Sequence, residues 1–220
     1  MQSRKYLSEF LGTGILVAVV VGSGIMATKL TNDTGIRLLI NTIATVLALG
    51  ILISIFAPIS GAHFNPVVTL AESPFKRISA SSASGYILAQ VLGGVCGAVV
   101  ANLMFKLPAI QMSSHTRSGA NIFLGEVVAT AGLLLIIQVL GYQKRGYLAP
   151  VLVAGWIGSA YFFTSSTSFA NPAVTFARGF SNSFSGIALH SVPLFILAQI
   201  IGAGIGTFLA LALREGDRHE

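Results

Sequence analysis

The chain has 220 residues, of which 54% are hydrophobic and only 9% are charged, and its mean hydropathy is +0.81. Soluble domains carry roughly a quarter charged residues, so this composition excludes an ordinary soluble protein and predicts an integral membrane protein with about six spans of roughly 20 residues. The formal net charge is +6. The basic residues are scattered among connectors without an aromatic-interleaved patch, which argues against nucleic-acid binding and fits contact with membrane lipid.

Six apolar segments follow one another along the chain. They cover residues 7–27, 37–57, 83–104, 121–141, 147–164 and 187–213. The first contains Glu9 and lacks a small-x-small cleavage site, so it reads as a span and not as a removable signal peptide. The only cysteine is Cys96, which excludes an internal disulfide and a cysteine metal cluster; no metal or other cofactor is expected.

A five-residue motif occurs twice between these segments. Asn65-Pro66-Val67-Val68-Thr69 lies between the second and third segments, and Asn171-Pro172-Ala173-Val174-Thr175 lies between the fifth and sixth. Asparagine is a preferred helix N-cap, and proline is tolerated in the first helical turn. Each copy therefore predicts a short helix that begins inside the membrane.

Other repeated features match the two copies. Glu9 and Glu126 stand early in the first and fourth segments, and Ile-Leu-Ala-Gln ends at Gln90 in the third and at Gln199 in the sixth. A Gly-x-x-x-Gly pair follows each glutamine, which predicts close helix contacts across a pseudo-two-fold axis. We expect one domain over residues 1–220, built from inverted three-span repeats at about 1–106 and 119–220, with its site near the bilayer midplane.

The distribution of basic residues predicts the orientation. With a cytoplasmic N-terminus, eight basic residues lie inside, against five outside. The inner set is Arg4, Lys5, Lys76, Arg77, Lys144, Arg145, Arg214 and Arg218, and the outer set is Lys29, Arg37, Lys106, Arg117 and Arg178. Both termini are therefore expected in the cytoplasm.

The paired motifs predict a barrier to charge. Two helix N-termini that meet at mid-depth place about half a positive elementary charge each beside the path, and Asn65 and Asn171 can offer N–H donors to a passing solute. The irregular stretches before them should expose backbone carbonyls as acceptors; they comprise Gly61, Ala62, His63 and Phe64 in the first copy and Thr167, Ser168, Phe169 and Ala170 in the second. Glu9 and Glu126 could form a proton relay or could support these loops by accepting hydrogen bonds, and we favour the supporting role. We expect Gln90 and Gln199 to support the loops as well.

The stretch Ser60-Gly61-Ala62-His63-Phe64-Asn65-Pro66 closely resembles the first pore loop of the major intrinsic protein, or aquaporin, family. With the duplicated Glu and Gln positions, the resemblance covers nearly the whole chain. It implies an all-α membrane fold of six transmembrane helices and two half-helices, assembled as a homotetramer with one pore per subunit. It also favours a pore-facing His63 over a histidine satisfied within its loop.

The sequence departs from the family pattern at the constriction. Arg usually stands three residues after the second Asn, but here Val174 occupies that position. Carried over by spacing, the other constriction residues are Thr45, Ser159 and Ser168, all small. Arg178 follows one helical turn later; it either guards the outer vestibule or extends to the lipid interface.

These observations predict a passive channel in the inner membrane for small uncharged solutes and water that excludes protons and ions. Candidate solutes are polyols, urea and neutral arsenic or other metalloid hydroxides. One alternative is a water-selective channel whose filter uses other residues. A second is an ion-coupled secondary transporter, which inverted repeats also permit. No nucleophile–base or metal constellation suggests an enzyme.

Overall fold

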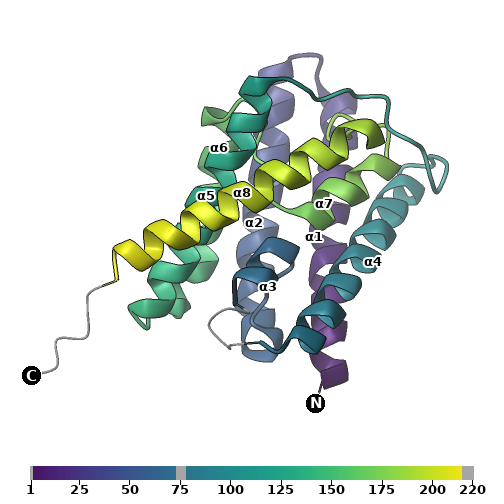
Figure 1. Cartoon of the computed structure of the whole chain (residues 1–220). Helices are drawn as coiled ribbons and strands as arrows, with labels where there is room; N and C mark the ends of the chain where they lie inside the picture. The colour runs from purple at the N-terminus through teal and green to yellow at the C-terminus, as the bar shows by residue number, and fades with distance from the viewer. Residues whose placement is uncertain (1, 73–77, 215–220) are drawn as a thin grey trace, which may run out of the picture.

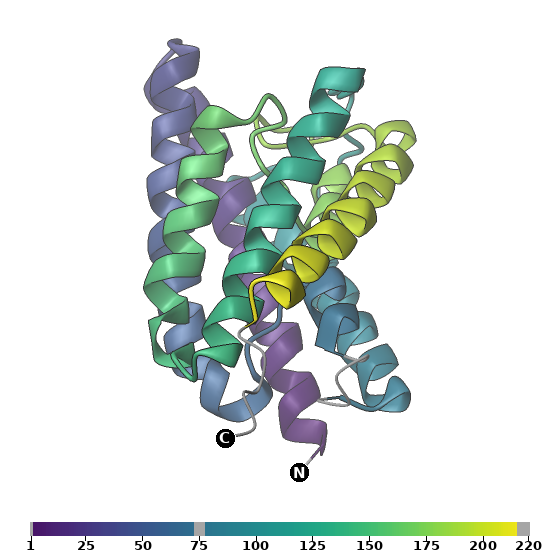
Figure 2. The ribbon, with the colours of Figure 1, turned by 60° about the vertical axis from the view of Figure 1, so that its left-hand side comes forward.

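The structure, a computed structural model, describes residues 2–72 and 78–214. Within these residues, six helices are long and apolar enough to cross a membrane. They are α1 (Gln2–Leu30), α2 (Thr34–Ser60), α4 (Ala80–Met104), α5 (Ala120–Tyr142), α6 (Ala149–Phe163, preceded by the short η1, Gly146–Leu148) and α8 (Val192–Ala212, preceded by η3, Leu189–Ser191). The all-helical membrane fold is therefore confirmed (Figures 1 and 2).

The helix ends follow local chemistry. Asp33 caps α2 by accepting a hydrogen bond from the N–H of Ile36 at 2.8 Å, and α2 ends at Gly61, whose φ of +89° suits glycine. Helix α8 starts at Val192, five residues later than the apolar run that begins at Ile187 suggests. Pro193 lies in the first turn of α8, where proline commonly stands.

Two short helices lie inside the bundle, one from each half of the chain. Helix α3 covers Pro66–Glu72 and α7 covers Pro172–Ala177, followed by η2 (Arg178–Phe180). At about 1.5 Å per residue neither is longer than about 10 Å, far short of a hydrocarbon layer of about 30 Å. Figure 1 shows α7 above α3 in the middle of the bundle, and the two helices touch.

Glycines bring the long helices together within each half. A Cβ on Gly97 of α4 would lie 2.9 Å from the carbonyl carbon of Gly14 on α1, and a Cβ on Gly206 of α8 would lie 2.9 Å from that of Ala131 on α5. The expectation that these glycines join helices across the pseudo-two-fold was wrong. Their partner helices, α1 and α5, belong to the same half, because the first and third spans of each repeat pack directly on each other.

The outer face of the bundle is apolar. Large side chains such as Leu47, Ile51 and Ile55 recur every fourth residue on α2 and are more than half exposed. A surface of this kind is suited to lipid chains and not to water.

Several of the basic residues used to predict orientation lie near the ends of the long helices. The start of α1 and the end of α8 point toward the same end (Figure 2), which also holds the α5–α6 connection with Lys144 and Arg145. Lys76, Arg77 and Arg218, which entered the predicted orientation, lie outside the described residues.

Candidate functional site

The backbone before each Asn-Pro motif folds in the same unusual way. Three residues in each loop have a positive φ, and they occupy equivalent positions 106 residues apart (65 against 171). They are Gly61 (89°), Ala62 (51°) and Phe64 (50°), with Thr167 (61°), Ser168 (51°) and Ala170 (48°) as their counterparts. Since a left-handed backbone costs about 1–2 kcal/mol at each non-glycine residue, the surroundings must hold both loops in place.

Glu9 of α1 holds the first loop. Its side chain is fully buried, and its carboxylate accepts hydrogen bonds from the backbone N–H groups of His63 (3.0 Å) and Phe64 (2.7 Å), from Ser60 Oγ (2.6 Å) and from Gln90 Nε2 (2.7 Å). Each carboxylate oxygen thus accepts two hydrogen bonds. Glu9 therefore fixes the course of the loop that leads to Asn65.

Glu126 of α5 does the same in the second half. It is also fully buried, and it accepts from the N–H groups of Phe169 (2.8 Å) and Ala170 (2.9 Å) and from Gln199 Nε2 (2.6 Å). Neither glutamate lines the cavity described below. This arrangement suits a supporting group and not a proton relay.

The two glutamines connect these glutamates to the half-helices. Gln90 Nε2 also donates to Thr69 Oγ1 (3.0 Å), and Thr69 Oγ1 donates to the Asn65 carbonyl (3.1 Å). The second half repeats the arrangement with Gln199 to Thr175 (2.8 Å) and Thr175 to Asn171 (2.7 Å). Each half thus ties its span, its loop and its half-helix into one network.

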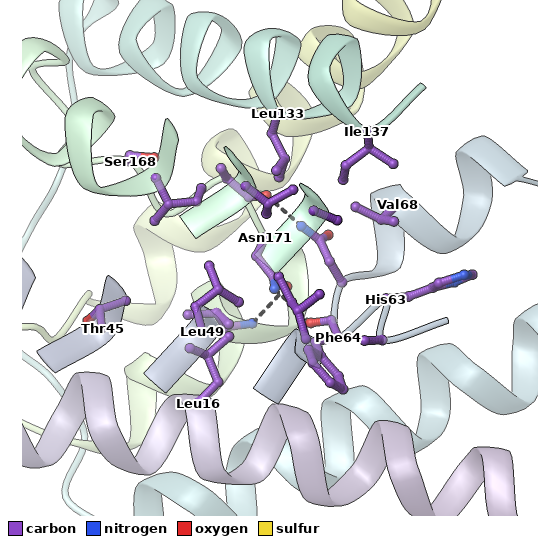
Figure 3. Close-up of a pocket in the computed structure, with 18 of the residues that line it drawn as sticks. Leu16, Thr45, Leu49, His63, Phe64, Val68, Leu133, Ile137, Ser168 and Asn171 are labelled. Atoms are coloured by element: carbon purple, nitrogen blue, oxygen red, sulfur yellow. Dashed lines mark hydrogen bonds between the residues drawn. The ribbon is translucent and has the colours of Figure 1, made fainter. Parts of the chain in front are cut away.

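Asn65 and Asn171 join the two halves at the centre of the molecule. Each side-chain oxygen caps its own half-helix, accepting from Val67 N–H in the first (3.1 Å) and from Ala173 N–H in the second (3.0 Å). The amide groups are crossed: Asn65 Nδ2 donates to the Ala170 carbonyl (2.8 Å) and Asn171 Nδ2 donates to the Phe64 carbonyl (2.7 Å), as the dashed lines in Figure 3 show. One N–H of each amide remains, and both side chains line the cavity.

A cavity of about 440 Å³ passes both asparagines. Its wall is mostly apolar, with side chains from α1, α2, α5 and α6 that include Leu16, Val20, Leu49, Ile53, Leu133, Ile137, Val153 and Ile157. The predicted loop residues Gly61, Ala62, His63, Phe64, Ser168, Phe169 and Ala170 line it as well, whereas half-buried Thr167 does not. Pro66, Val67, Pro172 and Ala173 form the first turns of the half-helices and do not line it.

The lining residues of the cavity fall on two sides of the asparagines. Thr45, Ser168 and Val174 line it on the side toward Arg178, and Figure 3 shows Thr45 and Ser168 on one side of Asn171 and His63 on the other. These two regions are called the Arg178 end and the His63 end below.

The predicted constriction residue Ser159 lies elsewhere. Its side chain is exposed on α6 and donates to the Gly155 carbonyl (3.0 Å), while Tyr161 lines the cavity and its hydroxyl approaches Thr45 Oγ1 at 3.4 Å. Side chains two residues apart on a helix point in directions that differ by about 200°. An error of two residues in the predicted position therefore selects an outward-facing residue in place of an inward-facing one. The expectation of four small residues was therefore wrong at this position, where an aromatic residue stands.

Arg178 is buried and lines the cavity. Its Nε donates to the Ser185 carbonyl, and its guanidinium carbon lies 3.3 Å from the centre of the Phe169 ring. Its backbone N–H bonds to the Val174 carbonyl, which places it one turn beyond Val174 on the same face. A buried position beside the cavity is not that of a side chain that extends to the lipid interface.

The His63 end has a different chemistry. His63 Nδ1 is 3.1 Å from Thr69 Oγ1, and its ring lies 5.2 Å from that of Tyr86, whose hydroxyl donates to the Ser60 carbonyl (2.8 Å). Glu72, the last residue of α3, lines the cavity here and accepts a hydrogen bond from Gln138 Nε2 (3.0 Å).

Tyr161, Tyr86 and Glu72 were not among the residues predicted from the sequence. A signal for Glu72 was present, since it stands at the position equivalent to Arg178, 106 residues earlier. For the tyrosines the sequence carried no comparable repeat. Among the residues that the structure describes, no group of three His, Cys, Asp or Glu side chains could hold a metal ion.

The sequence is similar to those of known proteins. The model of the family described as "Major intrinsic protein" matches residues 1–170. The chain is 47% identical over 201 residues to "Aquaglyceroporin AqpS" of Rhizobium meliloti, covering 91% of this chain and 86% of the relative. It is 29% identical over 231 residues to "Glycerol uptake facilitator protein-like 6" of Lactiplantibacillus plantarum, covering 97% and 100%.

A solved structure has the same fold. The X-ray structure of the aquaglyceroporin from Plasmodium falciparum superposes with a TM-score of 0.69 at 21% identity, covering 95% of each chain.

Proposed function

Because the chain belongs to the major intrinsic protein family, we propose that it is a passive transmembrane channel for small uncharged solutes and water. The observation that carries this proposal is the cavity that passes both capped half-helix N-termini. The positive ends of these helices oppose cations at the centre of the path. The remaining amide N–H of Asn65 and of Asn171 offers a hydrogen bond to any solute with a lone pair.

The composition of the Arg178 end favours solutes larger than water. Val174 is apolar and 5% exposed, so no charged side chain stands at the position where the family usually places Arg. Thr45 and Ser168 are small, and Tyr161 adds one hydroxyl at the edge of the wall. Candidate solutes are polyols, urea and neutral arsenic or other metalloid hydroxides, and the likeness to two proteins described as an aquaglyceroporin and a glycerol facilitator supports the first class.

Osmotic responses of proteoliposomes test the proposal. Stopped-flow light scattering after mixing with sucrose reports water flow, and mixing with glycerol, urea or arsenous acid reports re-swelling as each solute enters. We expect re-swelling with at least one of these solutes that exceeds that of protein-free liposomes. Fast water flow with exclusion of every larger solute would instead establish the water-selective alternative.

Replacing Val174 by arginine is expected to narrow the range of solutes. A guanidinium at this buried position fills the cavity beside Thr45 and Ser168, so glycerol entry should fall by about tenfold or more, equivalent to a barrier raised by at least about 1.4 kcal/mol. The initial rate of re-swelling measures this effect. Val174→Ala is the matched control, because it removes volume without adding charge; equal glycerol entry in wild type and Val174→Arg would contradict the proposed constriction.

The ion-coupled transporter alternative requires an ionisable group that faces the path and two halves that move apart. Glu9 and Glu126 are hydrogen-bonded to the loops and do not line the cavity, and the crossed side-chain hydrogen bonds of Asn65 and Asn171 join the two halves. Both observations favour the channel. Solute uptake that depends on an imposed proton or sodium gradient would support the transporter.

We also propose that the chain is an inner-membrane protein with both termini in the cytoplasm, assembled as a homotetramer with one pore in each subunit. The basic residues beside the ends of α1 and α8 support the orientation. The likeness to the family supports the assembly. Native mass spectrometry of the detergent-solubilised protein tests the tetramer.

A further inference from the structure

Arg178 is a buried cation with unused hydrogen-bond donors. The side chain is 2% exposed and lines the cavity, yet within the described residues only Nε donates a hydrogen bond, to the Ser185 carbonyl. The flat face of the guanidinium is covered by Phe169. The two terminal Nη groups therefore have no hydrogen-bond partner among the described residues.

Further polar groups lie at the same end of the cavity. The hydroxyl of Ser168 is buried and has no hydrogen-bond partner, and Ser168 lines the cavity next to Phe169 in the chain. The hydroxyl of Tyr161 has only the long contact to Thr45. These hydroxyls and the Arg178 Nη groups offer several donors around one small space.

The charge at this end is positive. The guanidinium carbon of Arg117 lies 5.1 Å from the Phe169 ring centre, so two arginines share one aromatic ring. Lys29 and Arg37 are at the same end of the bundle, and the described acidic residues near it are Asp33, which caps α2, and Glu126, whose carboxylate accepts from the N–H groups of Phe169 and Ala170. The basic residues outnumber these two acids. An anion is therefore attracted to this end.

The geometry selects the class of anion. A guanidinium presents two parallel N–H groups that match two oxygens bound to one central atom, and the apolar side chains of Val174 and Phe169, which line the cavity here, suit an apolar substituent on that atom. Beyond this point the wall is mostly apolar apart from the amides of Asn65 and Asn171, and Glu72 also lines the cavity. The helix N-termini attract an anion, but the apolar wall strips its hydration without replacing it, and this cost of dehydration opposes its passage.

We propose that the Arg178 end is a binding site for small monovalent oxyanions, in which Arg178 pairs with two oxygens and the Ser168 hydroxyl donates to a third. The bound anion occupies the path and obstructs neutral solutes. The obstruction, but not the binding, rests on the channel function proposed above.

Methanesulfonate and dimethyl sulfone form a matched pair of probes. Both are small and tetrahedral at sulfur, but only the first is an anion, and it remains charged at all accessible pH values. Water flow is measured in proteoliposomes with sodium gluconate as the bulky reference salt, and the probe is present on both sides of the membrane. We expect a saturable decrease in water flow with methanesulfonate and none with dimethyl sulfone.

Arg178→Gln is expected to raise the half-inhibitory concentration of methanesulfonate by about tenfold or more, because it removes a charge-assisted pair of bonds. Lys106→Asn is the matched control. It removes a positive charge from the same end, at an exposed residue that does not line the cavity and whose φ of 59° suits asparagine, and should change the half-inhibitory concentration far less than Arg178→Gln does. If Arg178→Gln does not conduct water, the half-inhibitory concentration is measured in Arg178→Lys instead, which keeps the charge but loses the paired N–H groups. A half-inhibitory concentration equal to that of wild type, in whichever of the two variants conducts water, overturns the proposal.

A binding measurement separates this proposal from the channel function. Magnetisation transfer from the detergent-solubilised protein to the methyl protons of methanesulfonate reports binding without transport. Transfer in wild type that is lost in Arg178→Gln supports the site even if no solute flow is found. Absence of transfer in wild type, or equal transfer in both proteins, overturns the site even if the channel conducts.

Discussion

Replacing Glu126 by glutamine lowers the free energy of unfolding by about 3–5 kcal/mol, the expected cost of breaking a buried charged network. The carboxylate accepts from Phe169 N–H, Ala170 N–H and Gln199 Nε2. An amide has one oxygen and one NH₂ group, so at least one of these donors would face another donor inside the protein. The loop backbone, which has a positive φ at Ser168 and Ala170, would then lose hydrogen bonds that stabilise this conformation.

Unfolding in mixed micelles with increasing dodecyl sulfate, followed by circular dichroism, measures this loss. Glu9→Gln should have an effect of the same size, because Glu9 accepts the equivalent bonds in the first loop. Asp33→Asn is the control: it also converts an acid to an amide, but at an exposed N-cap where asparagine serves equally well. A loss below about 1 kcal/mol in both glutamate variants would show that the loops do not depend on these carboxylates.

Replacing Gly206 by alanine is expected to destabilise the protein by about 3 kcal/mol. The added Cβ would overlap the carbonyl oxygen of Ala131 and would lie 2.9 Å and 3.0 Å from its carbonyl carbon and Cα. These are backbone atoms of α5, so no side-chain rotation relieves the overlap and the two helices must separate. Close packing of small residues is a main source of attraction between membrane helices, because lipid is as apolar as the helix surface.

Gly204→Ala provides the matched control on the same helix. A Cβ on Gly204 has no atom within 4 Å, and alanine is a better helix former than glycine by about 1 kcal/mol, so this variant should be neutral or slightly stabilising. The same dodecyl sulfate titration compares the two variants. Equal midpoints for Gly206→Ala and Gly204→Ala would contradict the close approach of α5 and α8.

The repeated motifs made much of the fold predictable. Asn65 and Asn171 stand before prolines in apolar surroundings, and local capping rules suffice to start a short helix at each. The matching positions of Glu9 and Glu126 then indicated support of the loops before any contact was known. These features depend on residues near in sequence or on the comparison of one half with the other.

Features that depend on rotation about a helix axis were harder to predict. Ser159 and Tyr161 are two residues apart on α6, and the rotation of this helix about its axis, set by packing against its neighbours, decides which of them faces the cavity. The position of Arg178 depends likewise on Phe169 and Ser185, which the chain brings to it from separate loops. No local pattern encodes such contacts.

The two crossed hydrogen bonds of the asparagine side chains make the centre of the pore an interface between the halves, and neither half can form it alone. The Asn65 amide needs an acceptor from residue 170, and the Asn171 amide needs one from residue 64, the equivalent position. Two copies of a single three-helix unit related by a two-fold axis would form this same reciprocal pair. The connection between α4 and α5 then acts as a tether. It holds each half at a high effective concentration near the other, so the halves need not meet as two separate chains.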